Sequence, residues 1–255
     1  MENNGLIGLS RQMALQRELD VVANNLANLN TTGFKADGNI FQEYLMPGAK
    51  NDHFANADRR MSYVVDRASW INFSQGSVQP TGNPLDVAID GDAFLVVQTP
   101  RGERYTRNGA LQINAQGQLV TADGLAVVGG NGPITFQSTD RGIAISREGT
   151  ITVREGQNVN ESQRGKLRLV AFTQPSRLRK DGANLFAAPD GLTPQPAPTT
   201  AGVQQGMIEK SNVRSIAEMT RMIEITRTYT TVASLIQQQG DLRRTAVERL
   251  ADVPA

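Results

Sequence analysis

Residues 85–130 have the sequence LDVAIDGDAFLVVQTPRGERYTRNGALQINAQGQLVTADGLAVVGG. Short β-prone runs in this stretch, such as AFLVVQ and QLVT, alternate with turn dipeptides such as Asp90-Gly91 and Asn108-Gly109. Such dipeptides favour the tight turns that join neighbouring antiparallel strands. The pattern therefore predicts a mostly antiparallel β domain at the centre of the chain.

An amphipathic helix is predicted on the N-terminal side of this block. Apolar residues recur there at spacings of 3 and 4, which place them on one stripe of an α-helix. They are Leu15, Leu19, Val22, Leu26 and Leu29. Asn28, Asn30 and Gly33 tolerate the left-handed backbone conformation that commonly ends a helix. We therefore expect this helix to stop near Thr31.

The C-terminal side carries a matching helical pattern. Ser215 and Glu218 have the spacing of a capping box, which marks the start of a helix. The apolar stripe that follows consists of Met222, Ile225, Tyr229, Val232 and Ile236. Because the pattern persists beyond about 25 residues, it favours a coiled-coil-like helix that pairs with its N-terminal counterpart. The alternative is that each helix packs separately on the central domain.

These patterns predict an α+β fold in which the two terminal helices form a stem that carries the β domain. Polar stretches and prolines suggest two connecting segments, one on each side of the β domain. The expected boundaries are a helix at 1–34, a linker or extended segment at 35–80, the β domain at 81–190, a proline-rich return linker at 191–210 and a helix at 211–255.

Composition excludes several classes of function. The 255 residues include 26 Lys and Arg against 25 Asp and Glu, so no strong field favours binding to nucleic acid. The chain has no Cys and only one His, His53, which excludes thiolate catalysis and any multi-histidine metal site. No apolar run approaches the ~20 residues that span a bilayer, and the start lacks a secretory leader. We therefore expect neither an integral membrane protein nor Sec export.

No catalytic site is predicted. Asp86, Asp90 and Asp92 lie close together, but Asp90 precedes a glycine and fits a hairpin turn better than acid–base chemistry. Trp70 with Phe73 suggests either a carbohydrate platform or ordinary packing, and packing is the more common role of a single Trp. We expect a protein without catalysis, cofactor, metal or small-molecule substrate.

The four asparagines at 24, 25, 28 and 30 oppose helix propensity and need an explanation. On a helical projection Asn24 and Asn28 lie opposite the leucine stripe. One interpretation is a ladder of amide hydrogen bonds between subunits, and the other is a frayed, capped helix end. The candidate assembly residues are Leu15, Leu19, Val22, Asn24, Asn25, Leu26, Asn28, Leu29, Met222, Ile225, Tyr229, Val232 and Ile236.

Apolar stripes on both terminal helices leave hydrophobic surface exposed on a single molecule. Pairing the helices with each other and then with neighbouring copies would bury it. If that contact does not close into a ring, identical copies build a helical filament. The leading hypothesis is a structural, self-assembling subunit, and the alternative is a secreted β-rich protein that binds the cell wall.

Three stretches of the sequence resemble the bacterial flagellar rod and hook protein family. The run ANNLANLNTTGFK at 23–35 is similar to the N-terminal signature of that family. The block at 85–129 resembles its β domain. VQQGMIEKSNV at 203–213, followed by EMTRMIEITRTYTTVASLI, is similar to its C-terminal block. The motifs occur in the expected order and cover most of the chain.

The resemblance implies a structural role in the rod of the flagellar basal body, with more similarity to the proximal-rod members than to the distal-rod ones. Copies would pack helically through their terminal helices, with the β domain outward, into the drive shaft that transmits torque across the periplasm. The implied partners are other rod proteins and neighbouring subunits. Export would run through the flagellar type III apparatus.

Overall fold

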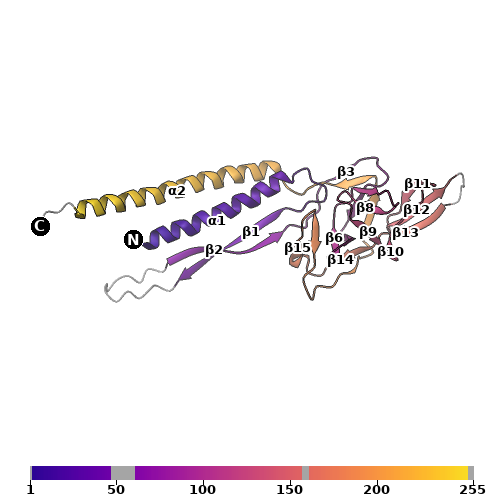
Figure 1. Cartoon of the computed structure of the whole chain (residues 1–255), viewed down its shortest axis with the longest axis horizontal. Coiled ribbons are helices and arrows are strands. Elements are labelled where there is room, and N and C mark those ends of the chain that lie inside the picture. Colours follow the sequence, from indigo (N-terminus) through magenta and orange to yellow (C-terminus); the bar gives the residue numbers. More distant parts are fainter. Residues whose placement is uncertain (1, 47–60, 157–160, 252–255) are drawn as a thin grey trace. The chain divides into compact units, whose positions relative to one another are not determined.

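The computed structural model describes residues 2–46, 61–156 and 161–251, which form two compact units (Figure 1). Of the described residues, the helical unit comprises 2–27, 37–46, 61–71 and 214–251, and the β unit comprises 28–36, 72–156 and 161–213. His53 lies outside the described residues. The α+β class is confirmed, since helices and a mostly antiparallel β domain are both present.

The helical unit consists of two helices and one long hairpin. Helix α1 spans Glu2–Ala27 and helix α2 spans Ser215–Ala251, while strands β1 (Asp37–Met46) and β2 (Met61–Ile71) pair antiparallel. Within this unit α1 contacts α2 on one side and the hairpin on the other (Figure 1). The two helices run antiparallel. Because α1 contacts both α2 and the hairpin, it is the middle layer of the unit.

Helix α1 ends earlier than the sequence predicts, and helix α2 begins at the expected residue but without the expected cap. Helix α1 ends at Ala27, before Leu29, because the chain turns at once and the backbone N–H of Thr31 donates to the carbonyl of Asn28 at 3.2 Å. Helix α2 begins at Ser215 as expected, but the Glu218 N–H donates to the carbonyl of Arg214 at 3.0 Å. One carboxylate oxygen of Glu218 is buried without a hydrogen-bond partner, so the predicted capping box does not form.

The β unit contains the remaining strands. Its largest sheet follows the order β15-β16-β6-β5-β9-β8-β7, to which β10, β14 and β17 are added at the side. The strands are β5 (Phe94–Thr99), β6 (Gly102–Thr106), β7 (Leu111–Ile113), β8 (Leu119–Thr121), β9 (Ala126–Gly129), β10 (Gly132–Pro133), β14 (Leu169–Ala171), β15 (Arg179–Lys180), β16 (Leu185–Ala187) and β17 (Gln195–Pro196). A short 3-10 helix at Pro175–Arg177 precedes β15.

Smaller sheets complete the β unit. Strands β11 (Asp140–Ile145), β12 (Thr150–Glu155) and β13 (Glu161–Lys166) form a three-stranded antiparallel sheet. Strand β4 (Val87–Asp90) pairs with β18 (Gly202–Gln205), and β3 (Val78–Pro80) pairs with β19 (Met207–Glu209). Because β4 and β5 lie in different sheets, Asp90-Gly91 joins two sheets and is not the hairpin turn that we expected.

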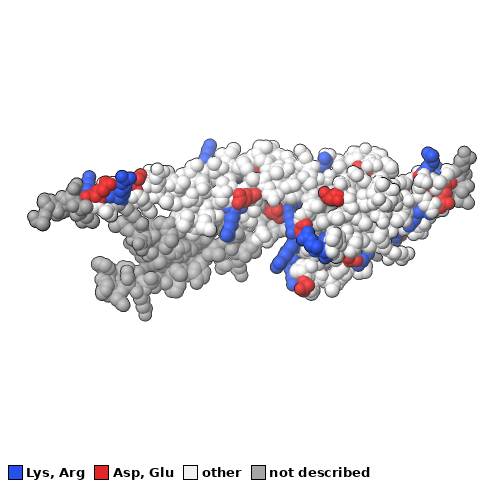
Figure 2. All heavy atoms as spheres, in the orientation of Figure 1, with Lys and Arg blue, Asp and Glu red and all other residues white. Residues whose placement is uncertain are grey.

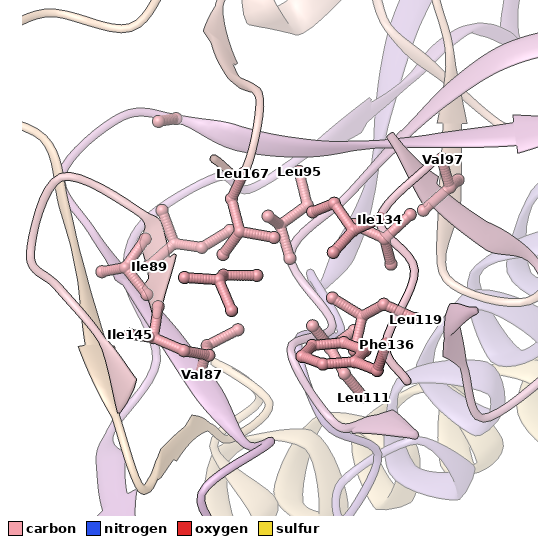
Figure 3. Close-up of a cluster of buried hydrophobic side chains, with 14 of the residues drawn as sticks. Val87, Ile89, Leu95, Val97, Leu111, Leu119, Ile134, Phe136, Ile145 and Leu167 are labelled. Carbon is pink, nitrogen blue, oxygen red and sulfur yellow. The ribbon is translucent and has the colours of Figure 1, made fainter. Parts of the chain in front are cut away.

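A close-packed apolar core holds the β unit together. Val87, Ile89, Leu95, Val97 and Ile151 are each 0% exposed. Figure 3 shows that side chains from different strands of the unit converge in this cluster. Burial of apolar surface on this scale is the main contribution to folding, at roughly 25 cal/mol for each Å².

The two units do not follow the boundaries expected from the sequence. The segment 35–80 contains the two longest strands of the described chain, β1 and β2. Residues 28–36 belong to the β unit, as do β18 and β19, which lie in the segment expected to be a return linker. The reason is pairing between distant segments, which local composition does not reveal.

Candidate assembly surface

The predicted apolar stripes of α1 and α2 face each other within the helical unit. Leu15, Val22 and Ile225 are the buried centre of this seam, with exposed fractions of 6%, 0% and 5%. Four further predicted residues pack around them as half-buried side chains: Leu19, Met222, Tyr229 and Val232. The seam accounts for most of the apolar candidates on both helices.

Close approach and polar bonds align the two helices along the seam. A Cβ atom placed on Gly8 would lie 2.9 Å from Cγ1 of Ile236, so glycine lets the helices approach there. Gln12 donates from Nε2 to the Tyr229 hydroxyl at 2.9 Å. Farther along, Arg221 donates to Oε1 of Glu18 at 2.7 Å. These contacts fix the antiparallel register.

The asparagines have intramolecular partners. Asn25 is 1% exposed, donates from Nδ2 to the carbonyl of Asp37 and accepts the backbone N–H of Asp37 at Oδ1, both at 2.9 Å. Asn28 lies just beyond α1 and accepts the Thr31 hydroxyl at 3.1 Å. Asn24 is exposed on α1. The amides of Asn25 and Asn28 therefore make hydrogen bonds within the chain's own fold.

Residues 28–36 are held in the β unit by several polar contacts. Lys180 donates from Nζ to the carbonyl of Lys35 at 2.7 Å, and the same ammonium lies 3.9 Å from the ring centre of Phe34. Asn212 accepts the backbone N–H of Ala36 at 2.8 Å. The asparagine-rich motif at 23–35 is thus divided between the helical unit and the β unit.

A buried charge cluster joins three distant segments of the β unit. Lys35, Arg107 and Glu209 are 0%, 2% and 0% exposed. Glu209 accepts Nζ of Lys35 at 2.6 Å on one oxygen and Nε of Arg107 at 2.9 Å on the other. Arg107 also donates from Nη1 to the carbonyls of Gly91 and Ala93 at 2.8 and 2.9 Å. Each of the three charged groups is hydrogen-bonded, which is the condition under which charges are tolerated in a core.

Burial lowers the pKa of Lys35 below its ordinary value, and the nearby Arg107 guanidinium acts in the same direction. The Glu209 carboxylate opposes both effects. Sequence reasoning missed this cluster. Lys35 lies in the motif at 23–35 and Glu209 in the motif at 203–213. No periodicity or composition indicates that two charges 174 positions apart are buried together.

The other candidates for chemistry have structural roles. Phe73 packs in an aromatic cluster, with its ring centre 5.5 Å from that of Phe94 and 5.2 Å from that of Phe186. It therefore forms no surface platform with Trp70. Asp86 accepts a hydrogen bond from Nδ2 of Asn83 at 3.0 Å. Within the described residues, no three His, Cys, Asp or Glu side chains gather as metal ligands.

Several large apolar side chains of the helical unit are exposed. On α2, Ile216 is 80%, Met219 49% and Ile223 54% exposed, and these three lie on the side of the helix opposite Ile225. Figure 2 shows a group of charged side chains near the C-terminal end of α2 and a further basic side chain about midway along it. No described helix is long and apolar enough to cross a membrane. Unsatisfied apolar surface of this kind marks an interaction site.

Comparison with known proteins matches three family models in chain order. Residues 6–35 match the flagella basal body rod protein model, and residues 88–153 match the flagellar hook protein FlgE/F/G D1 domain. Residues 204–249 match the flagellar basal body rod FlgEFG protein C-terminal model. A flagellar basal-body rod protein FlgF of Caulobacter vibrioides is 39% identical over 254 residues, which cover 99% of this chain and 100% of the relative.

The chain belongs to the flagellar basal-body rod protein family. A second rod protein FlgF, from Mesorhizobium japonicum, is 32% identical and covers 98% of each chain. A rod protein FlgG of Buchnera aphidicola is 34% identical but covers 85% of this chain and 87% of the relative. Within the family this rod protein is most like FlgF, and it is a structural subunit of the basal-body rod.

Proposed function

We propose that this rod subunit assembles helically with its own copies and with other rod proteins, and that the assembled rod transmits torque across the periplasm. Helices α1 and α2 act together as a coiled-coil-like stem. One observation carries the proposal. After the α1–α2 seam is closed, α2 still exposes Ile216, Met219 and Ile223 on the opposite side. Surface left over after intramolecular pairing is available to neighbouring subunits.

The predicted assembly residues contribute in two ways. Leu15, Leu19, Val22 and the α2 stripe align the helix pair, because they pack against each other inside one chain. Asn25 supports α1 by bonding Asp37, the first residue of the hairpin. Their role in assembly is therefore to hold the surface that neighbours contact. Leu26, near the end of α1, and Leu29, just beyond the helix in the β unit, are both half-buried.

The greater similarity to FlgF supports a place in the proximal rod. Export by the flagellar type III apparatus would follow from that place in the rod. A structural role also leaves no need for catalysis, a cofactor or a small-molecule substrate. A place in the distal rod is the alternative that an experiment must separate.

Labelling of the full-length protein in isolated hook-basal bodies tests this proposal. We expect label along the proximal part of the rod. Label confined to the distal part would support the alternative, and its absence from the rod would overturn the proposal. Val22→Asp places a charge in the seam and should prevent incorporation and motility. Ile113→Asp changes an exposed residue of the β unit, 38% exposed, and serves as the matched control.

A further inference from the structure

Two large apolar side chains of the hairpin, Ile40 and Trp70, lie on the face turned away from α1. Asn39 lies on the face of the hairpin toward α1 and donates from Nδ2 to the carbonyl of Arg17 at 3.3 Å. Successive side chains of a strand alternate between its two faces. Ile40 therefore lies on the other face, together with Trp70, and these side chains are 48% and 43% exposed.

The Trp70 ring packs against the backbone of its own hairpin on this outer face. It is the cross-strand partner of Gly38, and a Cβ atom on Gly38 would clash with the indole ring. The ring thus lies over the glycine, and Gly38 is buried beneath it. We call Gly38, Ile40 and Trp70 the hairpin face. A pre-positioned aromatic ring loses little conformational entropy on binding, which makes it a good anchor.

The α2 face, formed by Ile216, Met219 and Ile223, is the counterpart on the other side of the same unit. These residues lie within about two turns of the helix. The hydroxyl of Thr220, between them, donates to the carbonyl of Ile216 at 2.9 Å and is thereby satisfied within the helix. The Thr220 hydroxyl therefore needs no hydrogen-bond partner from outside the helix.

The two faces cannot meet within one chain, because α1 lies between α2 and the hairpin (Figure 1). They do lie at the same level of α1, since Arg17 contacts the hairpin and the adjacent Glu18 contacts Arg221 of α2. A second copy stacked in the same orientation would bring its hairpin face onto the α2 face of the first. Unlike faces that meet in this way build an open row of subunits.

We propose that the hairpin face of one subunit docks on the α2 face of a second copy of this chain, with Trp70 as the anchor. The inference rests on the proposed function, because it needs an assembly that contains several copies. The exposed parts of these side chains sum to an area on the order of 500 Å², below the ~1,200 Å² of a stable stand-alone interface. The contact therefore forms in the assembled row and not in a dilute dimer.

Trp70 is the chain's only tryptophan, so its fluorescence reports on this face without a label. We expect its emission to shift to shorter wavelength when the full-length protein assembles at high concentration. Acrylamide quenching should fall about twofold or more, because the centre of an interface excludes water. In the double variant Ile216→Asp/Ile223→Asp these changes should be lost, while Ile113→Asp keeps them.

Cross-linking identifies the partner, since the chain has no cysteine of its own. A mixture of I40C and I223C proteins should form mixed disulfides, and I40C alone should not form them with itself. Mainly I40C–I40C products would overturn the unlike-face contact. Cross-linking only to a different rod protein would overturn the choice of a second copy.

The two proposals fail in distinguishable ways. If the protein assembles but Trp70 stays as accessible to acrylamide as in the dilute monomer, the docking inference is wrong and the proposed function stands. If the full-length protein neither assembles nor enters the rod, both are wrong. Because Ile216 and Ile223 are exposed, their Asp variants should melt like the parent protein, which separates loss of docking from loss of folding.

Discussion

The β unit and the helical unit differ in how completely they bury their apolar side chains. The β unit has a large apolar core with many side chains at or near 0% exposure, and it also encloses the Lys35–Glu209–Arg107 cluster. In the part of the helical unit whose side chains are described, the apolar cluster between the helices has three buried members, Leu15, Val22 and Ile225, while apolar residues such as Ile216 remain exposed. A unit that closes its own core is stable alone, whereas one that leaves apolar surface outside is completed by neighbours.

Among the tests of this comparison, Glu209→Gln is expected to have the largest effect on stability. The change leaves Lys35 and Arg107 buried without their shared counter-charge, which should lower the free energy of unfolding by about 3–5 kcal/mol. Urea unfolding followed by circular dichroism measures it. Glu148→Gln, at a side chain that is 82% exposed, is the control and should stay within about 0.5 kcal/mol of the parent. A small effect of Glu209→Gln would mean that the cluster does not hold the β unit.

Leu95→Ala tests the apolar core of the β unit. Leu95 is 0% exposed, and the cavity together with the lost burial should cost about 2–5 kcal/mol. Leu242→Ala is the matched change on α2, where the side chain is 71% exposed, and we expect a change within about 0.5 kcal/mol. Equal losses in dilute monomer would show that the contrast between the units is wrong.

Asn25→Ala should weaken the helical unit alone. The backbone N–H and carbonyl of Asp37 lose their partner, at a cost of about 1–3 kcal/mol. Hydrogen exchange should accelerate in α1 and β1, while the amides of β5 keep their protection. Asn30→Ala, at an exposed position in the turn, is the control. Faster exchange throughout β5 would contradict the independence of the two units.

The smallest effect concerns pH. The hydrogen bonds from Arg164 hold the pKa of Asp140 below its ordinary value of 3.8. The carboxylate therefore stabilises the fold above that value, and this contribution is lost as pH falls through the lower folded-state pKa. Asp140→Asn should lower stability at neutral pH and flatten the loss between about pH 4 and pH 2. Stability curves of both proteins against pH that run parallel there would refute this role.

Local patterns were enough to predict the two helices and the antiparallel strands of the central block, but not the hairpin of β1 and β2. The stripe from Leu15 to Val22 and the stripe from Met222 to Val232 do line one seam, and the glycine dipeptides do separate strands. Both signals depend on neighbours a few positions apart in the chain, where helical period and turn geometry act. The family resemblance also rests on contiguous motifs, so it was accessible without a structure.

Only the tertiary structure decided which segments belong together. Lys35 and Glu209 meet across 174 positions, β18 and β19 return to β4 and β3, and the asparagine-rich motif is divided between two units. The outward placement of Trp70 depends on Asn39 bonding to α1 on the other side of the strand. Such pairings form because burial in a common core outweighs the entropy cost of closing long loops, and no local pattern records that balance.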